Sequence, residues 1–129
     1  MKELLGEHTC VAKAASGEIL TSDARGILPP LNWLRKNPGL LRGAEAADKV
    51  VGKAAALLFA FGGVKYIWAE CMSGAAIAYL ESAGIPFEYA ERVERIMNRE
   101  GTGMCPMERR ALAIDDPAEA FRVFDGMIP

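Results

Sequence analysis

The 129-residue chain lacks a long hydrophobic run, has a single histidine and contains only three cysteines. Its longest strictly apolar stretch, AAALLFAF at 54–61, is far shorter than the roughly 20 residues that cross a bilayer. The cysteines are odd in number and widely spaced, which favours free thiols in a reducing compartment over a disulfide framework. No apolar stretch near the start is long enough for a secretory signal peptide. We therefore expect a cytoplasmic protein that does not enter a membrane.

A strong charge of either sign is also missing. Lysine and arginine number 15 and the acidic residues 17, which leaves a net charge of -2. Such a chain has no overall field that attracts nucleic acid, so any anion site must be local. The length, the 51% hydrophobic content and the absence of repeats or linkers predict a single domain over residues 1–129.

Hydrophobic periodicity and turn residues predict an alternation of strands and helices. A β-hairpin is expected from runs on either side of Gly17, and a long apolar helix is expected to begin at Asp48 and end at a glycine pair. A charged run at 91–95 is typical of a solvated helix face. The alternation favours βαβ units in a layered α/β domain. The predicted strands are 8–14, 18–22, 64–69 and 86–89, and the predicted helices are 31–37, 48–63, 73–83 and 118–125.

Three segments, RGILPPL, ADKVVGKAAALL and NREGTGMCPME, together resemble the bacterial and archaeal family called domain of unknown function 1893. The resemblance spans nearly the whole chain. It implies the cytidine-deaminase-like fold, a three-layer α/β domain whose mixed sheet has helices on both faces. A fold of this kind hosts many chemistries, so the resemblance alone names no reaction.

The zinc chemistry of deaminases is argued against by the sequence. Those enzymes place H-x-E or C-x-E at the start of one helix and P-C-x-x-C at the start of the next. Residues 48–53 contain no His, Cys or Glu, and residues 69–76 keep one cysteine, Cys71, while the single histidine, His8, lies in the first predicted strand. Zinc normally needs three protein ligands. We therefore expect no metal and no other cofactor.

The first candidate site is the predicted helix start at 48–53. With Asp48 as N-cap, Lys49 and Lys53 would lie four residues apart on one helical face and hold a phosphate or carboxylate beside the free N–H groups. Gly52 would allow a ligand or another backbone to come close. The alternative is an ordinary cap with a packing glycine and solvated lysines.

The second candidate site is the stretch GTGMCPMERR at 101–110. Cys105 would cap a helix with Pro106 in its first turn, and Glu108 would accept a hydrogen bond from the backbone N–H of Cys105 in a capping box. Cysteine is a poor cap, and a thiol at a helix start has a lowered pKa, which suits a nucleophile. A purely structural cysteine is the alternative.

Three functions remain open from the sequence. The leading hypothesis is a metal-free domain that binds a small anionic ligand, with a nucleotide or nucleoside derivative suggested by the fold alone. The residues expected to bind it are Asp48, Lys49, Gly52, Lys53, Asn98 and Arg99, with Cys105 and Glu108 nearby. The second is an enzyme in which Cys105 is the nucleophile and Glu108 the acid or base. The third is an interaction protein that forms a homo-oligomer through its methionine-rich end, Met97, Met104, Met107 and Met127.

Overall fold

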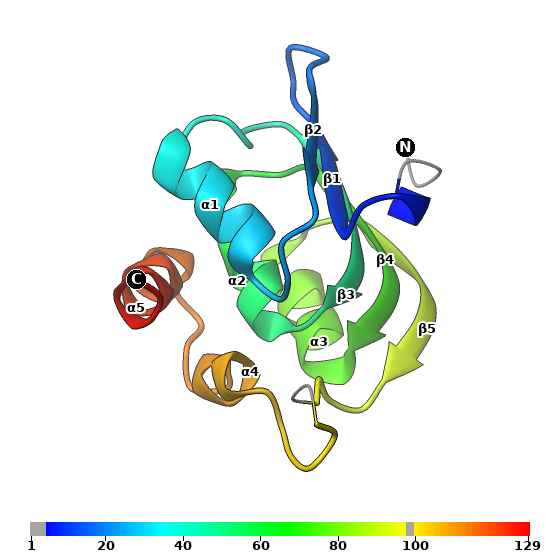
Figure 1. Cartoon of the computed structure of the whole chain (residues 1–129), viewed down its shortest axis with the longest axis vertical. Helices are drawn as coiled ribbons and strands as arrows, with labels where there is room; N and C mark the ends of the chain where they lie inside the picture. Colours follow the sequence, from blue (N-terminus) through cyan, green and yellow to red (C-terminus); the bar gives the residue numbers. More distant parts are fainter. Residues whose placement is uncertain (1–4, 98–99) are drawn as a thin grey trace.

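A mixed sheet forms one side of the molecule (Figure 1). Within residues 5–97 and 100–129, which the computed structural model describes, it has five strands in the order β2-β1-β3-β4-β5. β1 runs antiparallel to both of its neighbours, whereas β3, β4 and β5 are mutually parallel. The predicted α/β class with a mixed sheet is therefore confirmed. The strands are β1 (Cys10–Lys13), β2 (Ile19–Ser22), β3 (Glu45–Val51), β4 (Tyr66–Ser73) and β5 (Phe87–Val93).

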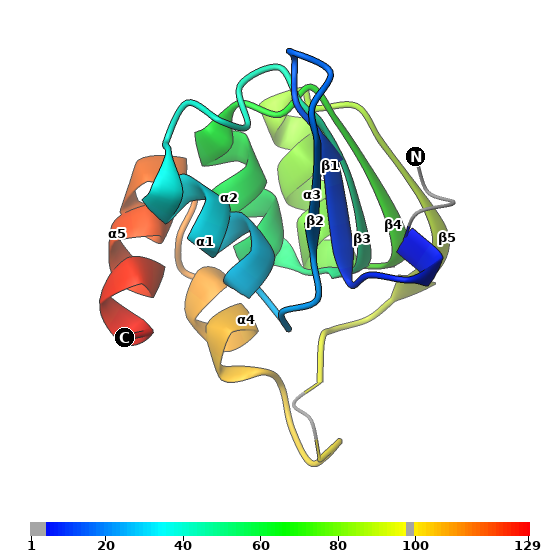
Figure 2. The same ribbon diagram turned by 45° about the horizontal axis from the view of Figure 1, so that its top comes forward.

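The helices pack against one face of this sheet, as Figure 2 shows. The expectation of helices on both faces is wrong. Parallel crossovers share one hand, and because β3, β4 and β5 follow one another in the same direction across the sheet, their connecting helices fall on the same side. The other face carries a small cluster of Leu5, Val11 and Ala47 with Trp68 packed against it. The helices are α1 (Leu28–Lys36), α2 (Lys53–Gly62), α3 (Gly74–Ala83), α4 (Pro106–Ala111) and α5 (Pro117–Met127).

The apolar helix α2 lies at the centre of the core. Residues 54–59 are at most 3% exposed, because α2 has the sheet on one side and α5 on the other, with α1, α3 and α4 also in contact with it. Phe61 stacks on Phe121 of α5 with ring centroids 4.9 Å apart. The helix ends at Gly63, whose φ of 83° is left-handed. The predicted burial of this helix on most sides is confirmed, as is its glycine end.

The predicted start of this helix is wrong. Asp48 belongs to the strand β3, which pairs with β1 so that Asp48 lies opposite Cys10. α2 begins only at Lys53, with Gly52 at its N-cap. The run from Ala46 to Leu58 is apolar with few interruptions, so its sequence does not show where the buried strand stops and the buried helix starts.

The remaining elements follow the sequence more closely. The hairpin β1–β2 is confirmed, and Ser73 and Asp116 cap α3 and α5 through their side-chain oxygens. The prediction that the charged run at 91–95 forms a helix face is wrong, because residues 91–93 continue the edge strand β5. No helix in the described part of the chain is both long enough and apolar enough to span a membrane.

Candidate functional site

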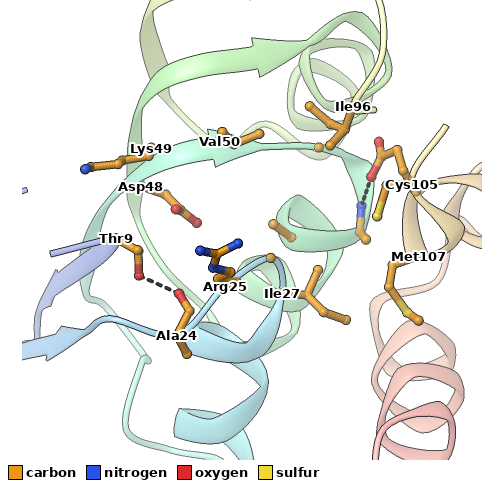
Figure 3. Close-up of a pocket in the computed structure, with 15 residues that line it drawn as sticks. Thr9, Ala24, Arg25, Ile27, Asp48, Lys49, Val50, Ile96, Cys105 and Met107 are labelled. Carbon is orange, nitrogen blue, oxygen red and sulfur yellow. Dashed lines mark hydrogen bonds between the residues drawn. The ribbon is translucent and has the colours of Figure 1, made fainter. Parts of the chain in front are cut away.

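A cavity of about 210 Å³ lies beside the carboxyl end of β3 (Figure 3). Its walls come from β3, from the loop that precedes α1, from the first turn of α2 and from the start of α4. Asp48 and Cys105 both line it, although 57 positions separate them in the chain. Two of the regions that the sequence singles out thus meet at one cavity, and the lining residues used below are Arg25, Ile27, Asp48, Lys49, Val50, Gly52, Ile96, Cys105, Met107 and Glu108.

Asp48 is the most unusual residue of this cavity. It is only 4% exposed, and its Oδ2 atom has no hydrogen-bond partner in the described structure. Burial raises the pKa of this carboxyl group to about 7, against the opposing effect of the Val50 and Lys49 N–H groups and of the Cys10 thiol. Both protonation states are therefore populated near neutral pH.

Arg25 supplies the positive charge that faces Asp48. It lies on the exposed loop before α1, and its guanidinium group points toward the Asp48 carboxyl group (Figure 3). Among the described residues this guanidinium group has no ion-pair partner. The Lys49 ammonium group, by contrast, points away from the cavity. Sequence reasoning missed Arg25 because a single arginine in the segment DARGIL carries no recognisable signal.

Glu108 caps a different helix from the one predicted. Glu108 is 3% exposed, and its Oε1 atom accepts from the Lys53 N–H at 2.5 Å while its Oε2 atom accepts from the Ala54 N–H at 3.1 Å. The expected capping box within its own helix is wrong, since the Cys105 N–H donates to the Ile96 carbonyl at 2.9 Å. Gly52 makes room for this carboxylate, because a Cβ atom there would lie 2.6 Å from Cδ of Glu108.

The predicted pair of lysines does not form. Lys53 directs its ammonium group away from the cavity, toward Asp115 Oδ1 at 2.8 Å and the Leu112 carbonyl at 3.4 Å. Its side chain is 10% exposed. Because Lys49 is in a strand and Lys53 in the following helix, the two do not share a helical face.

Cys105 lies at the N-cap of α4, as predicted, and is partly buried in the cavity wall. Its side chain makes no capping hydrogen bond, and α4 is only six residues long. The role of Cys105 as a nucleophile remains a prediction. Asn98 and Arg99, the other two residues expected near the ligand, lie outside the described residues.

Comparison with known proteins places the chain in a family. The family model described as TM1506, domain of unknown function (DUF1893), matches residues 2–128. The chain belongs to this family. A solved structure of a DUF1893 family protein from Thermotoga maritima matches with a TM-score of 0.87 and 27% identity, over 98% of this chain and 86% of that one. The search of curated proteins found no match. These comparisons confirm the family resemblance but not the cytidine-deaminase-like fold that it implied.

The methionines of this DUF1893 protein do not all line the same pocket. Met107 lines the cavity, whereas Met104 and Met127 line a separate open groove with Arg109 and Arg110. Met97 forms an isolated backbone bridge with Met104. In the part of this DUF1893 protein that the structure describes, no three His, Cys, Asp or Glu residues are grouped so as to hold a metal ion.

Proposed function

We propose that this DUF1893 protein binds a small polar molecule in the cavity at Asp48, with Arg25 receiving an anionic group of the ligand. The observation that carries the proposal is the buried Oδ2 atom of Asp48, which has no partner among the residues that the structure describes. Buried polar atoms in folded proteins are nearly always hydrogen-bonded, and an exception usually has a functional reason. A cavity lined by Asp48 and by Arg25, which has no ion-pair partner in the described part of the chain, has complementary contacts for a ligand with both a donor and an anion.

The position of the cavity supports binding. In open α/β sheets, ligands bind outside the carboxyl ends of the parallel strands. The cavity lies at the carboxyl end of β3, which is parallel to β4.

The size of the cavity limits the ligand. A volume of about 210 Å³ corresponds to about seven water molecules, so it holds a small molecule or one ring of a larger molecule. Ile27, Ile96 and Met107 provide apolar walls for such a ring. A nucleoside or nucleotide, in which a polar ring carries a charged group at one end, is a ligand of this kind.

A thermal-shift and calorimetric screen of nucleosides, nucleotides and small carboxylic acids tests the proposal. A true ligand should bind about 10- to 100-fold more weakly to Asp48→Asn and to Arg25→Ala, because each variant removes a charged hydrogen-bonding partner. The matched controls Glu18→Gln and Arg42→Ala change exposed side chains away from the cavity and should leave affinity unchanged. A ligand whose affinity neither cavity variant alters would contradict the proposal.

A second candidate function, catalysis by Cys105, is favoured by one observation: this cysteine lines the same cavity as Asp48. Since both oxygens of Glu108 accept N–H groups of α2, Asp48 is the better placed carboxyl group for proton exchange with a ligand. Iodoacetamide at neutral pH should then label Cys105 well before Cys71 and Cys10, and a bound ligand should slow that labelling. Equally slow labelling of Cys105 and Cys71 would argue against catalysis and leave binding in place.

A further inference from the structure

We infer that the part of the ligand that reaches Asp48, which we call the floor of the cavity, is a nitrogen hydrogen-bond donor and not a phosphate or carboxylate. Such a donor is an amidinium, an ammonium or the N–H edge of a ring. The inference rests on the proposed binding function and names the chemistry of the ligand. It reverses the orientation expected from the sequence, in which an anion binds at the start of α2.

The anion site at the start of α2 is already occupied by the protein itself. Free N–H groups in the first turn of a helix attract anions. Here the N–H groups of Lys53 and Ala54 both donate to the Glu108 carboxylate. A ligand phosphate would have to displace this buried side chain, so the start of α2 offers no vacant anion site at these two groups.

The charges that face Asp48 also disfavour an anion at the floor. The buried Cys10 lies opposite Asp48 on β1, and the buried Glu108 lines the same cavity from the start of α4; neither carries a positive charge. Cys105, also from the start of α4, is a thiol, and the Lys53 ammonium group is turned toward Asp115. Arg25 is the cation that points at Asp48, and it lies on an exposed loop. An anion therefore fits at the mouth of the cavity, and a donor fits at the floor.

A donor at the floor supplies the one contact that Asp48 lacks. Asp48 lines the cavity, and its buried Oδ2 atom has no partner in the described structure. Hydrogen bonds from N–H groups to a carboxylate are shorter and stronger than neutral ones, and the low dielectric of a buried site increases this difference. The apolar side chains of Ile27, Ile96 and Met107 lower the polarity around the contact, which strengthens it.

Benzamidine and benzoate provide a matched pair of probes, since they share a ring and nearly the same shape but carry an amidinium or a carboxylate. We expect benzamidine, titrated at about pH 8 where Asp48 is ionised, to shift the NMR signals of Asp48, Ile27 and Met107. Its affinity should exceed that of benzoate by about tenfold or more. Asp48→Asn should lower benzamidine affinity about tenfold, and Glu18→Gln should not.

The outcomes separate the two proposals. Benzoate binding at these residues as tightly as benzamidine, or more tightly in Asp48→Asn, would overturn the donor inference while the cavity remained a binding site. Signals that neither probe shifts would also overturn it, and the metabolite screen with Arg25→Ala would then decide the proposed function separately. The NMR spectrum of each variant shows that it is folded, so that loss of binding is not mistaken for unfolding.

Discussion

The carboxyl group of Asp48 destabilises the strand that carries it. Asp48 is 4% exposed, and burial raises its pKa from 3.8 to about 7. The folded protein therefore holds a proton on this group between about pH 4 and pH 7, whereas the unfolded chain has already released it. Stability falls as the pH rises wherever the folded state binds more protons. The contribution of Asp48 thus becomes less favourable through this window and is least favourable above it.

Replacing Asp48 by Asn tests how much the ionised carboxyl group lowers the free energy of unfolding. The amide has nearly the same shape and no charge, so we expect Asp48→Asn to raise the free energy of unfolding by about 2 to 4 kcal/mol at pH 8 and much less at pH 5. Chemical unfolding curves of both proteins at the two pH values measure the difference. The exposed control Glu18→Gln should change stability little at either pH, and an Asp48→Asn gain that did not depend on pH would show that the carboxyl group titrates normally.

At the scale of single residues, the sequence indicated some of the cavity residues but not their contacts. Asp48, Gly52, Cys105 and Glu108 do line the cavity. The last three were noticeable in the sequence because they stand at the starts of helices, where glycines and polar residues are common. Their contacts were not predictable. The partner of Glu108 is a helix start 54 positions earlier, and the direction of the Lys53 ammonium group depends on the loop that carries Asp115.

At the scale of elements, Glu108 and Gly52 join α4 to α2. The carboxylate replaces the side-chain cap that the N-cap glycine of α2 cannot supply. We expect Glu108→Ala to lower the free energy of unfolding by about 2 to 4 kcal/mol, because it leaves buried N–H groups without partners and opens a cavity. Gly52→Ala should cost about 1 to 3 kcal/mol, because its new Cβ displaces the carboxylate.

The double variant distinguishes this explanation from ordinary backbone effects. In the Glu108→Ala background the space beside residue 52 is empty, so the additional cost of Gly52→Ala should fall well below its cost in the native protein. Gly126→Ala is a suitable control, since nothing lies within 4 Å of its added Cβ, and it should be neutral or slightly stabilising. Additive costs in the double variant would indicate that Gly52 and Glu108 act independently.

The helices and strands were predictable wherever the hydrophobic residues followed either the helical or the strand periodicity. The hairpin, α3 and α5 have clear caps, turns or alternation. β3 was missed because a buried parallel strand joins a buried helix through one glycine, and both are apolar on most sides. The start of β5 was predicted as a strand, but its second half was mistaken for a helix face, because an edge strand exposes both of its surfaces and charged residues are found on either side.

At the scale of the whole molecule, the helices are held in two layers over the sheet. α2 is the inner helix, and α5 covers it from outside. Arg35 of α1 fastens α5 in place, since its Nε donates to Asp125 Oδ1 at 2.5 Å and its guanidinium group also donates to the Asp125 and Ile128 carbonyls. The opposite face of the sheet has a much thinner cover, with Leu5, Val11 and Ala47 as its buried residues. The inner strands are therefore protected mainly by the helical layers.

The reactivity of the Cys10 thiol measures how well the sheet and the helical layers protect the inner strands. Cys10 is fully buried in β1, between two other strands and under the helical layer, and burial raises its thiol pKa well above the ordinary value. Its thiol can react only when the sheet opens. In a Cys71→Ser, Cys105→Ser protein, which leaves Cys10 as the single cysteine, we expect labelling by Ellman's reagent to follow global unfolding, with the same urea midpoint and slope as the circular dichroism signal.

The control is a Cys10→Ser, Cys105→Ser protein, which keeps Cys71 as its single cysteine. Cys71 lies on the exposed side of β4 beside Glu91, with its sulfur 3.5 Å from Oε1, and its pKa is raised by partial burial and by that carboxylate. It should therefore react slowly but without denaturant. Labelling of Cys10 well below the unfolding midpoint would show instead that the β1–β2 hairpin separates from β3 before the helices unfold. Because Cys10 faces Asp48 across that strand pair, such opening would also expose the side of the cavity that Asp48 lines.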